Sequence, residues 1–151
     1  MLDIVIKKMA KEHIEDVYNV EKNCFSTPWS VQSLSSELEN ENAIFFVAIL
    51  NEQAVGYIGA HCVCRECYIY NIAVLPKYRK QKIATCLLAF FIDNFRKNCD
   101  FISLEVRKSN LNAIKLYENF GFKKVGLRKD FYLKPKEDAI IMTLYSWKEP
   151  P

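Results

Sequence analysis

The sequence contains no apolar run that approaches the ~20 residues needed to span a bilayer as a helix. Its first segment, MLDIVIKKMAKEH, mixes acidic and basic side chains and therefore lacks the apolar centre of a secretory signal peptide. The chain also has little net charge, +3 over 151 residues, so its bulk charge does not indicate a dedicated nucleic-acid binder. We therefore expect a cytoplasmic protein, a monomer or a weak dimer, that binds neither membrane nor nucleic acid directly.

The chain does have enough apolar side chain for one core. Hydrophobic residues make up 50% of its 151 positions, which suits a single domain over residues 1–151. Charged residues make up 26%, a share that does not indicate disorder. Repeats and low-complexity stretches are absent.

Six cysteines occur in this chain without an export signal, at Cys24, Cys62, Cys64, Cys67, Cys86 and Cys99. Reduced thiols are therefore favoured over a disulfide framework. The cluster from His61 to Cys67 has the residue types of a metal site, but structural zinc usually needs a second ligand pair far along the chain. None is visible, so we expect no metal and interpret the cluster as a tight hairpin that turns at Arg65 and Glu66.

Hydrophobic periodicity predicts alternating blocks of strands and helices. Strands are expected at 2–8, 44–50, 54–63, 67–74, 101–106, 123–133 and 139–147, and helices at 9–25, 30–39, 83–97 and 110–120. Ser30 and Asn110 are expected to cap helices, and Gly121 to end one in the left-handed conformation. Because a helix connects 67–74 to 101–106, these two strands are expected to be parallel. The fold class is α/β (α+β), with a mixed, mostly antiparallel sheet of six to seven strands and about four helices on both faces.

Three segments carry a family resemblance: NIAVLPKYRKQKIA (71–84), LEVRKSN (104–110) and AIKLYENFGF (113–122). Together with the order of elements, they resemble the GNAT superfamily of N-acetyltransferases along essentially the whole chain. The resemblance implies that acetyl-CoA is the cosubstrate. It also implies cofactor contacts at Ile72, Ala73, Val74, Arg79, Lys80, Gln81, Lys82, Ile83, Ala84, Thr85, Asn110 and Tyr117.

The start of the helix at 83–97 suits a diphosphate, because a helix amino terminus offers free N–H groups and a positive dipole end. The four basic residues between 77 and 82 add positive charge there, although such a run is also typical of a solvated loop. The family pattern Arg-x-x-Gly-x-Gly/Ala is Arg79-Lys-Gln-Lys82-Ile-Ala84 here, so lysine replaces the first glycine. Glycine serves where the backbone approaches phosphate closely or adopts a positive φ. We favour a Lys82 that points outward and contacts phosphate over one that crowds the site.

Acetyl transfer to an amine needs removal of a proton from nitrogen and protonation of a departing thiolate. Glu105 lies inside a predicted core strand, where a carboxylate is costly unless it is used or paired. Its alternative role is an ion pair at the strand end. Tyr117 lies on the apolar face of its helix, where simple packing is the alternative. The resemblance implies that Glu105 is the general base, directly or through water, and that Tyr117 is the general acid.

Two further segments, EKNCFSTPWS (21–30) and EDAIIM (137–142), look like the RimI branch of the family. This resemblance implies acetylation of the N-terminal α-amine of a ribosomal protein that begins with alanine. An α-amine has a pKa of about 8 against about 10.4 for lysine, so less is asked of the base. Trp29, Tyr132 and Glu137 are candidate walls of the peptide groove. An acetyltransferase for small amines and a weakly active acyl-CoA-binding module stay open as alternatives.

Overall fold

A computed structural model describes residues 3–146, which form a sheet with the strand order β1-β2-β3-β4-β5-β7-β6. The strands are β1 Val5–Lys8, β2 Ala43–Leu50, β3 Gln53–Val63, β4 Glu66–Val74, β5 Phe101–Arg107, β6 Lys123–Leu133 and β7 Lys136–Tyr145. The α-helices of this described part are α1 Ile14–Cys24, α2 Val31–Glu39, α3 Ile83–Phe95 and α4 Leu111–Asn119. Short 3-10 turns occupy Lys11–His13, Pro76–Tyr78 and Arg96–Asn98.

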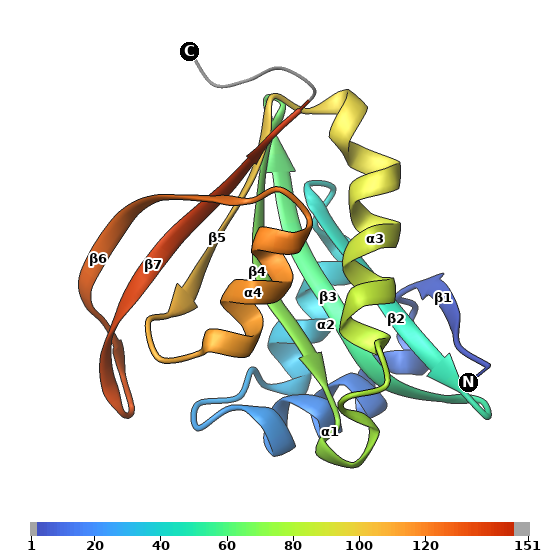
Figure 1. Cartoon of the computed structure of the whole chain (residues 1–151). Helices are drawn as coiled ribbons and strands as arrows, with labels where there is room; N and C mark the ends of the chain where they lie inside the picture. The colour runs from blue at the N-terminus through green and yellow to red at the C-terminus, as the bar shows by residue number, and fades with distance from the viewer. Residues whose placement is uncertain (1–2, 147–151) are drawn as a thin grey trace.

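The sheet is mixed, because β4 and β5 are parallel while the other neighbouring strands are antiparallel. In Figure 1, α3 and α4 lie in front of the sheet and α1 and α2 lie behind it, so both faces are covered. The expected mixed, mostly antiparallel sheet of six to seven strands with about four helices on both faces is confirmed, with seven strands, and so is the parallel pair. Among residues 3–146, the helices are all too short or too polar to cross a membrane.

Local side-chain chemistry sets several element ends where the sequence predicts them. Ser30 caps α2 by accepting a hydrogen bond from the Ser33 N–H at 3.0 Å, and Asn110 caps α4 through the Ala113 N–H at 3.2 Å. Gly121 follows α4 with a φ of 96°, a left-handed conformation that an L side chain rarely adopts. The three expectations for these residues are confirmed.

Several element ends differ from the prediction, and three of the larger differences have a local cause. The first helix begins at Ile14 rather than Met9, because Ala10 is extended (φ −123°, ψ 172°) and a 3-10 turn intervenes. The helix α3 ends at Phe95 and continues as a 3-10 turn. The last strand begins at Lys136 rather than Ala139, since only Lys134 and Pro135 separate it from β6. Its expected end, Trp147, lies outside the described residues.

The expectation of reduced thiols is wrong for one pair, because Cys62 and Cys67 form a disulfide across β3 and β4. They are directly opposed in the ladder, with Cα atoms 4.1 Å apart. The hairpin turns at Cys64 and Arg65, both with positive φ (51° and 68°), and not at Arg65 and Glu66. That one-residue shift brings the two sulfur atoms together, and the sequence pattern did not resolve it.

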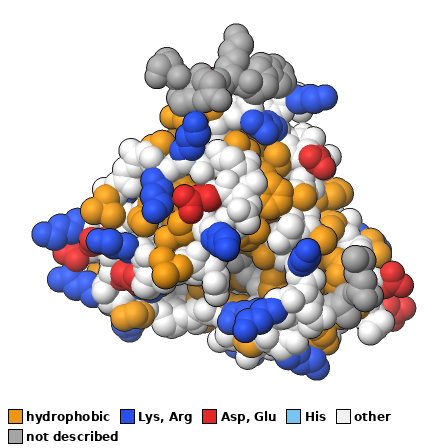
Figure 2. All heavy atoms as spheres, viewed as in Figure 1, with side chains coloured by type: hydrophobic (Ala, Val, Ile, Leu, Met, Phe, Trp, Pro, Cys, Tyr) orange, Lys and Arg blue, Asp and Glu red, His pale blue; other side chains and the backbone are white. Residues whose placement is uncertain are grey.

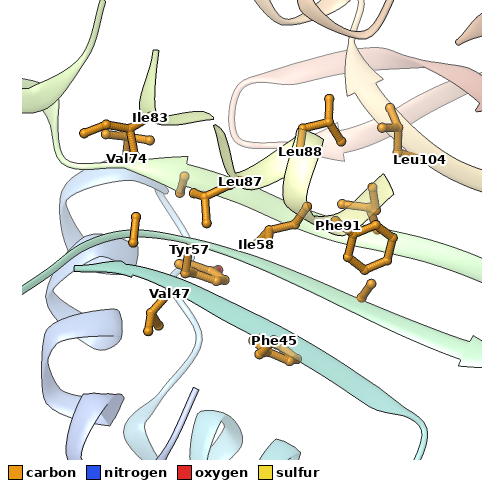
Figure 3. Close-up of a cluster of buried hydrophobic side chains, with 14 of the residues drawn as sticks. Phe45, Val47, Tyr57, Ile58, Val74, Ile83, Leu87, Leu88, Phe91 and Leu104 are labelled. Atoms are coloured by element: carbon orange, nitrogen blue, oxygen red, sulfur yellow. The ribbon is translucent and has the colours of Figure 1, made fainter. Parts of the chain in front are cut away.

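The main core lies between α3 and the centre of the sheet (Figure 3). Leu87, Leu88 and Phe91 of α3 are each 0% exposed, and they pack on the face of the sheet that carries Ile58 of β3. Full burial of such a side chain contributes roughly 1.5–3 kcal/mol. This packing fixes the amino terminus of α3 close to the carboxyl end of β4.

Candidate active site

The two parallel strands at the centre of the sheet separate halfway along their length. β4 and β5 pair from Glu66 with Phe101 to Ile69 with Leu104, and no further. At this point β4 carries a bulge at Tyr70, because Gly59 faces Asn71 while Ala60 faces Ile69. A bulge bends its strand and increases the local twist, so it turns the rest of β4 away from β5. Figure 1 shows the two arrowheads diverging.

A cleft of ≈ 710 Å³ occupies this fork. Its walls come from α1 and the following loop, from β4, β5 and α4, and from the tip of the β6–β7 hairpin. The structure brings six of the predicted site residues to this cleft: Trp29, Ile72, Glu105, Asn110, Tyr117 and Tyr132. Residues predicted for cofactor, for proton transfer and for peptide therefore share one cavity.

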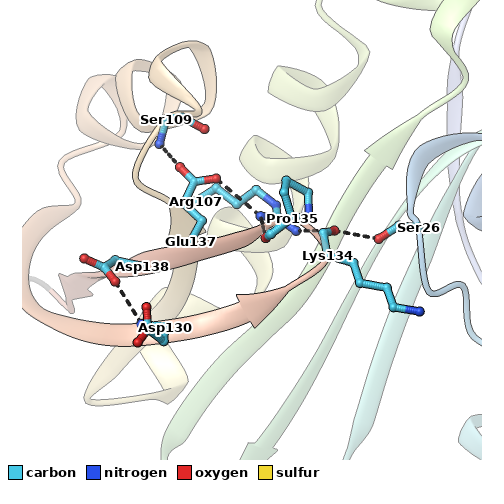
Figure 4. A network of polar contacts seen from close by, with 8 residues as sticks. All are labelled: Ser26, Arg107, Ser109, Asp130, Lys134, Pro135, Glu137 and Asp138. Atoms are coloured by element: carbon cyan, nitrogen blue, oxygen red, sulfur yellow. Dashed lines mark hydrogen bonds and ion pairs between the residues drawn. The ribbon is translucent and has the colours of Figure 1, made fainter.

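Glu137 does not line the cleft. Its carboxylate accepts hydrogen bonds from the Ser109 N–H at 2.5 Å and from an Arg107 Nη at 3.3 Å. The bond to Ser109 lowers the pKa of the Glu137 carboxyl. As Figure 4 shows, this residue ties the start of β7 to the loop that precedes α4.

Glu105 is the first residue of β5 beyond its pairing with β4, so its side chain lies at the apex of the fork. The side chain is 28% exposed, and its carboxylate accepts a hydrogen bond from Arg128 Nε at 3.2 Å. Arg128 lies on β6 and is 55% exposed. Glu105 thus forms an ion pair, which was the alternative role that the sequence offered, and its carboxylate also reaches the cleft.

Tyr117 projects from α4 into the same cleft and is only 9% exposed. Burial raises the pKa of its phenol, so the hydroxyl keeps its proton at neutral pH. Its ring packs against Phe122 at a centroid distance of 5.8 Å, while no described residue hydrogen-bonds its hydroxyl. A protonated hydroxyl that is free of other partners is suited to donate a proton to a group in the cleft.

The basic turn lies between the end of β4 and α3, outside the residues that line the cleft. Arg79 folds back, and its Nε donates to the Val74 carbonyl at 3.1 Å. Lys82 is left-handed, with φ 65° and ψ 21°, and its carbonyl accepts the first helical bond from the Cys86 N–H at 3.0 Å. The N–H groups of the next three residues, Ile83 to Thr85, begin the helix and have no acceptor within it. The turn thus adopts at Lys82 the conformation for which glycine is normally used.

Lys82→Gly is expected to stabilise the protein. A lysine in the left-handed conformation is less favourable than a glycine by roughly 1–2 kcal/mol. Part of this gain is offset, because glycine raises the conformational entropy of the unfolded chain. The predicted result is a small rise in the free energy of unfolding, measured by urea titration. Lys80→Gly is the matched comparison, because Lys80 also has a positive φ, of 63°.

The same Lys82→Gly variant tests the contact to phosphate. If the ammonium group contributes to cofactor affinity, calorimetry will show weaker acetyl-CoA binding in the more stable variant. Tighter binding would show that the lysine crowds the turn.

A buried carboxylate in the cleft wall was not singled out by the sequence. Glu21 is 1% exposed, and it accepts hydrogen bonds from the Trp29 N–H at 2.8 Å and from the Tyr57 hydroxyl at 2.7 Å. Tyr57 in turn accepts from Asn71 Nδ2 at 3.0 Å. Burial raises the pKa of Glu21. Helical spacing was the available signal, because Glu21 continues the buried face of Ile14 and Val17.

A second group that the sequence did not reveal holds the tip of the β6–β7 hairpin over the cleft (Figure 4). Arg107 donates to the carbonyls of Pro135 at 2.8 Å and Lys134 at 3.0 Å, and its guanidinium lies 4.2 Å from the Tyr132 ring centroid. The Ser26 hydroxyl donates to the same Lys134 carbonyl at 2.8 Å. The hairpin tip is therefore fastened both to β5 and to the loop after α1.

Charge on the face that carries α3 and α4 is distributed. Figure 2 shows Lys and Arg side chains spread over this face with acidic side chains between them, and they do not merge into one patch. The positive potential available to an anionic cofactor is therefore local, from the basic turn and the amino terminus of α3.

Comparison with known proteins identifies the family of this chain. The model of the acetyltransferase (GNAT) family matches residues 14–122. A Bacillus subtilis protein provisionally named a ribosomal protein bS18-alanine N-acetyltransferase is 37% identical over 139 residues, which is 91% of this chain and 92% of that protein.

Two solved structures are similar over almost the whole chain. The crystal structure of the ribosomal-protein-S18-alanine N-acetyltransferase from Escherichia coli has a TM-score of 0.88 and 31% identity, covering 97% of this chain and 96% of that one. A chain of the NatC complex, solved with Gag peptide and CoA, has a TM-score of 0.81 and 28% identity, covering 95% and 99%. The resemblance to the RimI branch is confirmed. The chain belongs to the GNAT family of acetyltransferases and is an acetyl-CoA-dependent N-acetyltransferase.

Proposed function

We propose that this enzyme acetylates the N-terminal α-amine of a ribosomal protein that begins with alanine, of the bS18 type. The observation that carries the proposal is the cleft at the β4–β5 fork, where Glu105 and Tyr117 face one cavity whose outer walls are two loops. The relatives that are named for this activity match the chain over nine tenths of its length. A small-molecule amine is the competing acceptor.

Acetyl-CoA supplies the acetyl group as an activated thioester. The residues present fit it, because β4 beyond Ile69 has no partner on its β5 side and offers free backbone groups to an extended amide arm. Ile72 and Ala73 lie on that edge, and at its end the Val74 carbonyl accepts a hydrogen bond from Arg79 Nε at 3.1 Å. The amino terminus of α3 and the basic turn before it suit the diphosphate.

Glu105 serves as the general base. Its carboxylate takes a proton from the acceptor ammonium, directly or through one water, so that the neutral nitrogen can attack the acetyl carbonyl carbon. Arg128 orients the carboxylate through its Nε. Because an α-amine has a pKa of about 8 against about 10.4 for lysine, a larger fraction of it is already neutral near pH 7, and less is asked of the base.

Tyr117 serves as the general acid. As the nitrogen–carbon bond forms, the carbon–sulfur bond breaks, the departing sulfur gains a proton from the phenol hydroxyl, and the acetylated nitrogen releases its second proton to solvent. The raised pKa keeps Tyr117 protonated before that step. Bulk solvent restores the proton after product release.

The acceptor binds at the end of the cleft that is bordered by the loop at 25–30 and the tip of the β6–β7 hairpin, two segments that the Ser26–Lys134 hydrogen bond joins. Trp29 and Tyr132 both line the cleft there, and the Arg107 guanidinium stacks over the Tyr132 ring. Glu137 supports this wall indirectly, through its contact with Arg107. A wall of aromatic side chains and backbone carbonyls suits an extended peptide.

The test is turnover with acetyl-CoA and a peptide that carries the amino-terminal sequence of the bS18 protein from the same cell. Release of free CoA and a mass increase of one acetyl group on the α-amine are expected. The same peptide with a blocked amino terminus and an internal lysine is the control, and it should not react. Turnover of small amines without turnover of any N-terminal peptide would overturn the proposal.

A further inference from the structure

Glu21 occupies a position that is unfavourable on three counts. Its carboxylate is buried, with 1% of the residue exposed, and burial of a charge is costly unless it is paired. No described lysine, arginine or histidine forms an ion pair with it. It also lies near the carboxyl end of α1, where the helix dipole disfavours an acid. Such unfavourable residues persist at functional sites more often than elsewhere.

The contacts of Glu21 run to both sides of the acceptor end of the cleft. On one side, its Oε1 holds the backbone N–H of Trp29, in the loop that closes the peptide entrance. On the other side, its Oε2 holds the Tyr57 hydroxyl, which in turn holds the Asn71 side chain on β4. Glu21, Trp29 and Asn71 all line the cleft. One carboxylate therefore links the loop that carries Trp29 to the strand β4 that carries Asn71.

We infer that Glu21 is a positioning residue that sets the acceptor end of the cleft, by holding the loop at 25–30 in register with β4 through Trp29 and the Tyr57–Asn71 pair. The inference rests on the proposed function and adds a residue that determines acceptor binding. Glu21 does not touch the reacting atoms. It acts through the two walls between which the acceptor lies.

The chain offers a carboxylate with a purely structural bond for comparison. Asp16 lies on the same helix, and its Oδ2 accepts a hydrogen bond from the Ala54 N–H at 3.0 Å. Neither Asp16 nor Ala54 lines the cleft. Asp16→Asn therefore removes a similar charge from the same helix without reaching the acceptor site.

The experiment compares Glu21→Gln, Tyr57→Phe and Asp16→Asn with the wild-type enzyme. Glutamine replaces one of the two acceptor oxygens by an NH2 donor, so it cannot accept both the Trp29 N–H and the Tyr57 O–H at their present positions. The expected result is a rise of about tenfold in the KM for the N-terminal peptide, equivalent to ~1.4 kcal/mol, with the KM for acetyl-CoA within about twofold of wild type. Tyr57→Phe is expected to give the same split to a smaller degree. Asp16→Asn is expected to lower thermal stability and leave both KM values unchanged.

Calorimetric titration of peptide into the CoA-loaded enzyme is the second measurement, because it does not depend on turnover. A peptide KM and Kd unchanged in Glu21→Gln, with wild type active, would overturn the inference and leave the proposed function standing. Wild-type enzyme that neither binds nor acetylates N-terminal peptides would overturn both. If Glu21→Gln does not fold, Tyr57→Phe decides, since it leaves the Glu21 bond to Trp29 in place, and an unchanged peptide KM there would also overturn the inference.

Discussion

Replacing Glu105 by glutamine is expected to lower kcat for peptide acetylation by about 10²–10⁴-fold, the range in which general acid–base groups contribute. Glutamine has nearly the same shape as glutamate, but its amide cannot accept the proton of the acceptor ammonium. The change does not touch β4 or the basic turn, which are proposed to bind acetyl-CoA. Steady-state kinetics at saturating acetyl-CoA should therefore show the loss in kcat, with acetyl-CoA affinity retained in calorimetry.

Arg128→Gln is the control that separates the two roles of Glu105. It removes the ion pair at 3.2 Å but leaves the carboxylate in the cleft. Because Arg128 is 55% exposed, the pair itself contributes little, on the order of 0–1 kcal/mol. Arg128→Gln should thus keep most of the activity. A loss as large as that of Glu105→Gln would mean that the ion pair, and not the base, is what catalysis needs.

The parts of this fold that sequence predicts well are those set by a few neighbouring residues. Ser30, Asn110 and Gly121 act on N–H and carbonyl groups within one helical turn, so their roles are visible in the chain itself. The parallel pairing of β4 with β5 follows from the helix between them, because a crossover connection of that length requires it.

The parts that sequence misses depend on contacts between distant segments. Glu21 receives its partners from a loop eight residues away and from Tyr57 on a different element. Arg107 meets carbonyl groups 27 and 28 positions along the chain. Cys62 and Cys67 are close in sequence, yet their pairing depends on which two residues form the turn. A shift of one residue in the hairpin register would place different residues opposite each other, and hydrophobic periodicity does not determine the register to one residue.

In the candidate site, too, the sequence predicted the main residues but not the distant residues that contact them. Glu105, Tyr117, Trp29 and Tyr132 reach one cleft, as their segments suggested, but the partners that orient them come from elsewhere. Arg79 illustrates the difference most directly. The resemblance implies that it contacts the cofactor, and the sequence did not show that its Nε also donates to the Val74 carbonyl at the end of β4.

Tyr117→Phe is expected to lower kcat by about 10²-fold or more, because it removes the hydroxyl that is proposed to protonate the departing sulfur. Phenylalanine keeps the packing against Phe122, so the melting temperature should change little. Since burial raises the pKa of Tyr117, its deprotonation should not limit the wild-type rate in the neutral range. The measurement is kcat against pH for both proteins.

Tyr132→Phe is the comparison that tests the assignment, because Tyr132 places a second phenol in the same cleft and burial raises its pKa as well. The Arg107 guanidinium stacks over the Tyr132 ring on the peptide wall, so loss of the Tyr132 hydroxyl should act mainly on the peptide KM.

Glu105 and Tyr117 serve one transition state. The variant that combines Glu105→Gln and Tyr117→Phe should therefore lose less kcat than the product of the two single losses. A larger fall of kcat in Tyr132→Phe than in Tyr117→Phe would transfer the role of general acid to the hairpin.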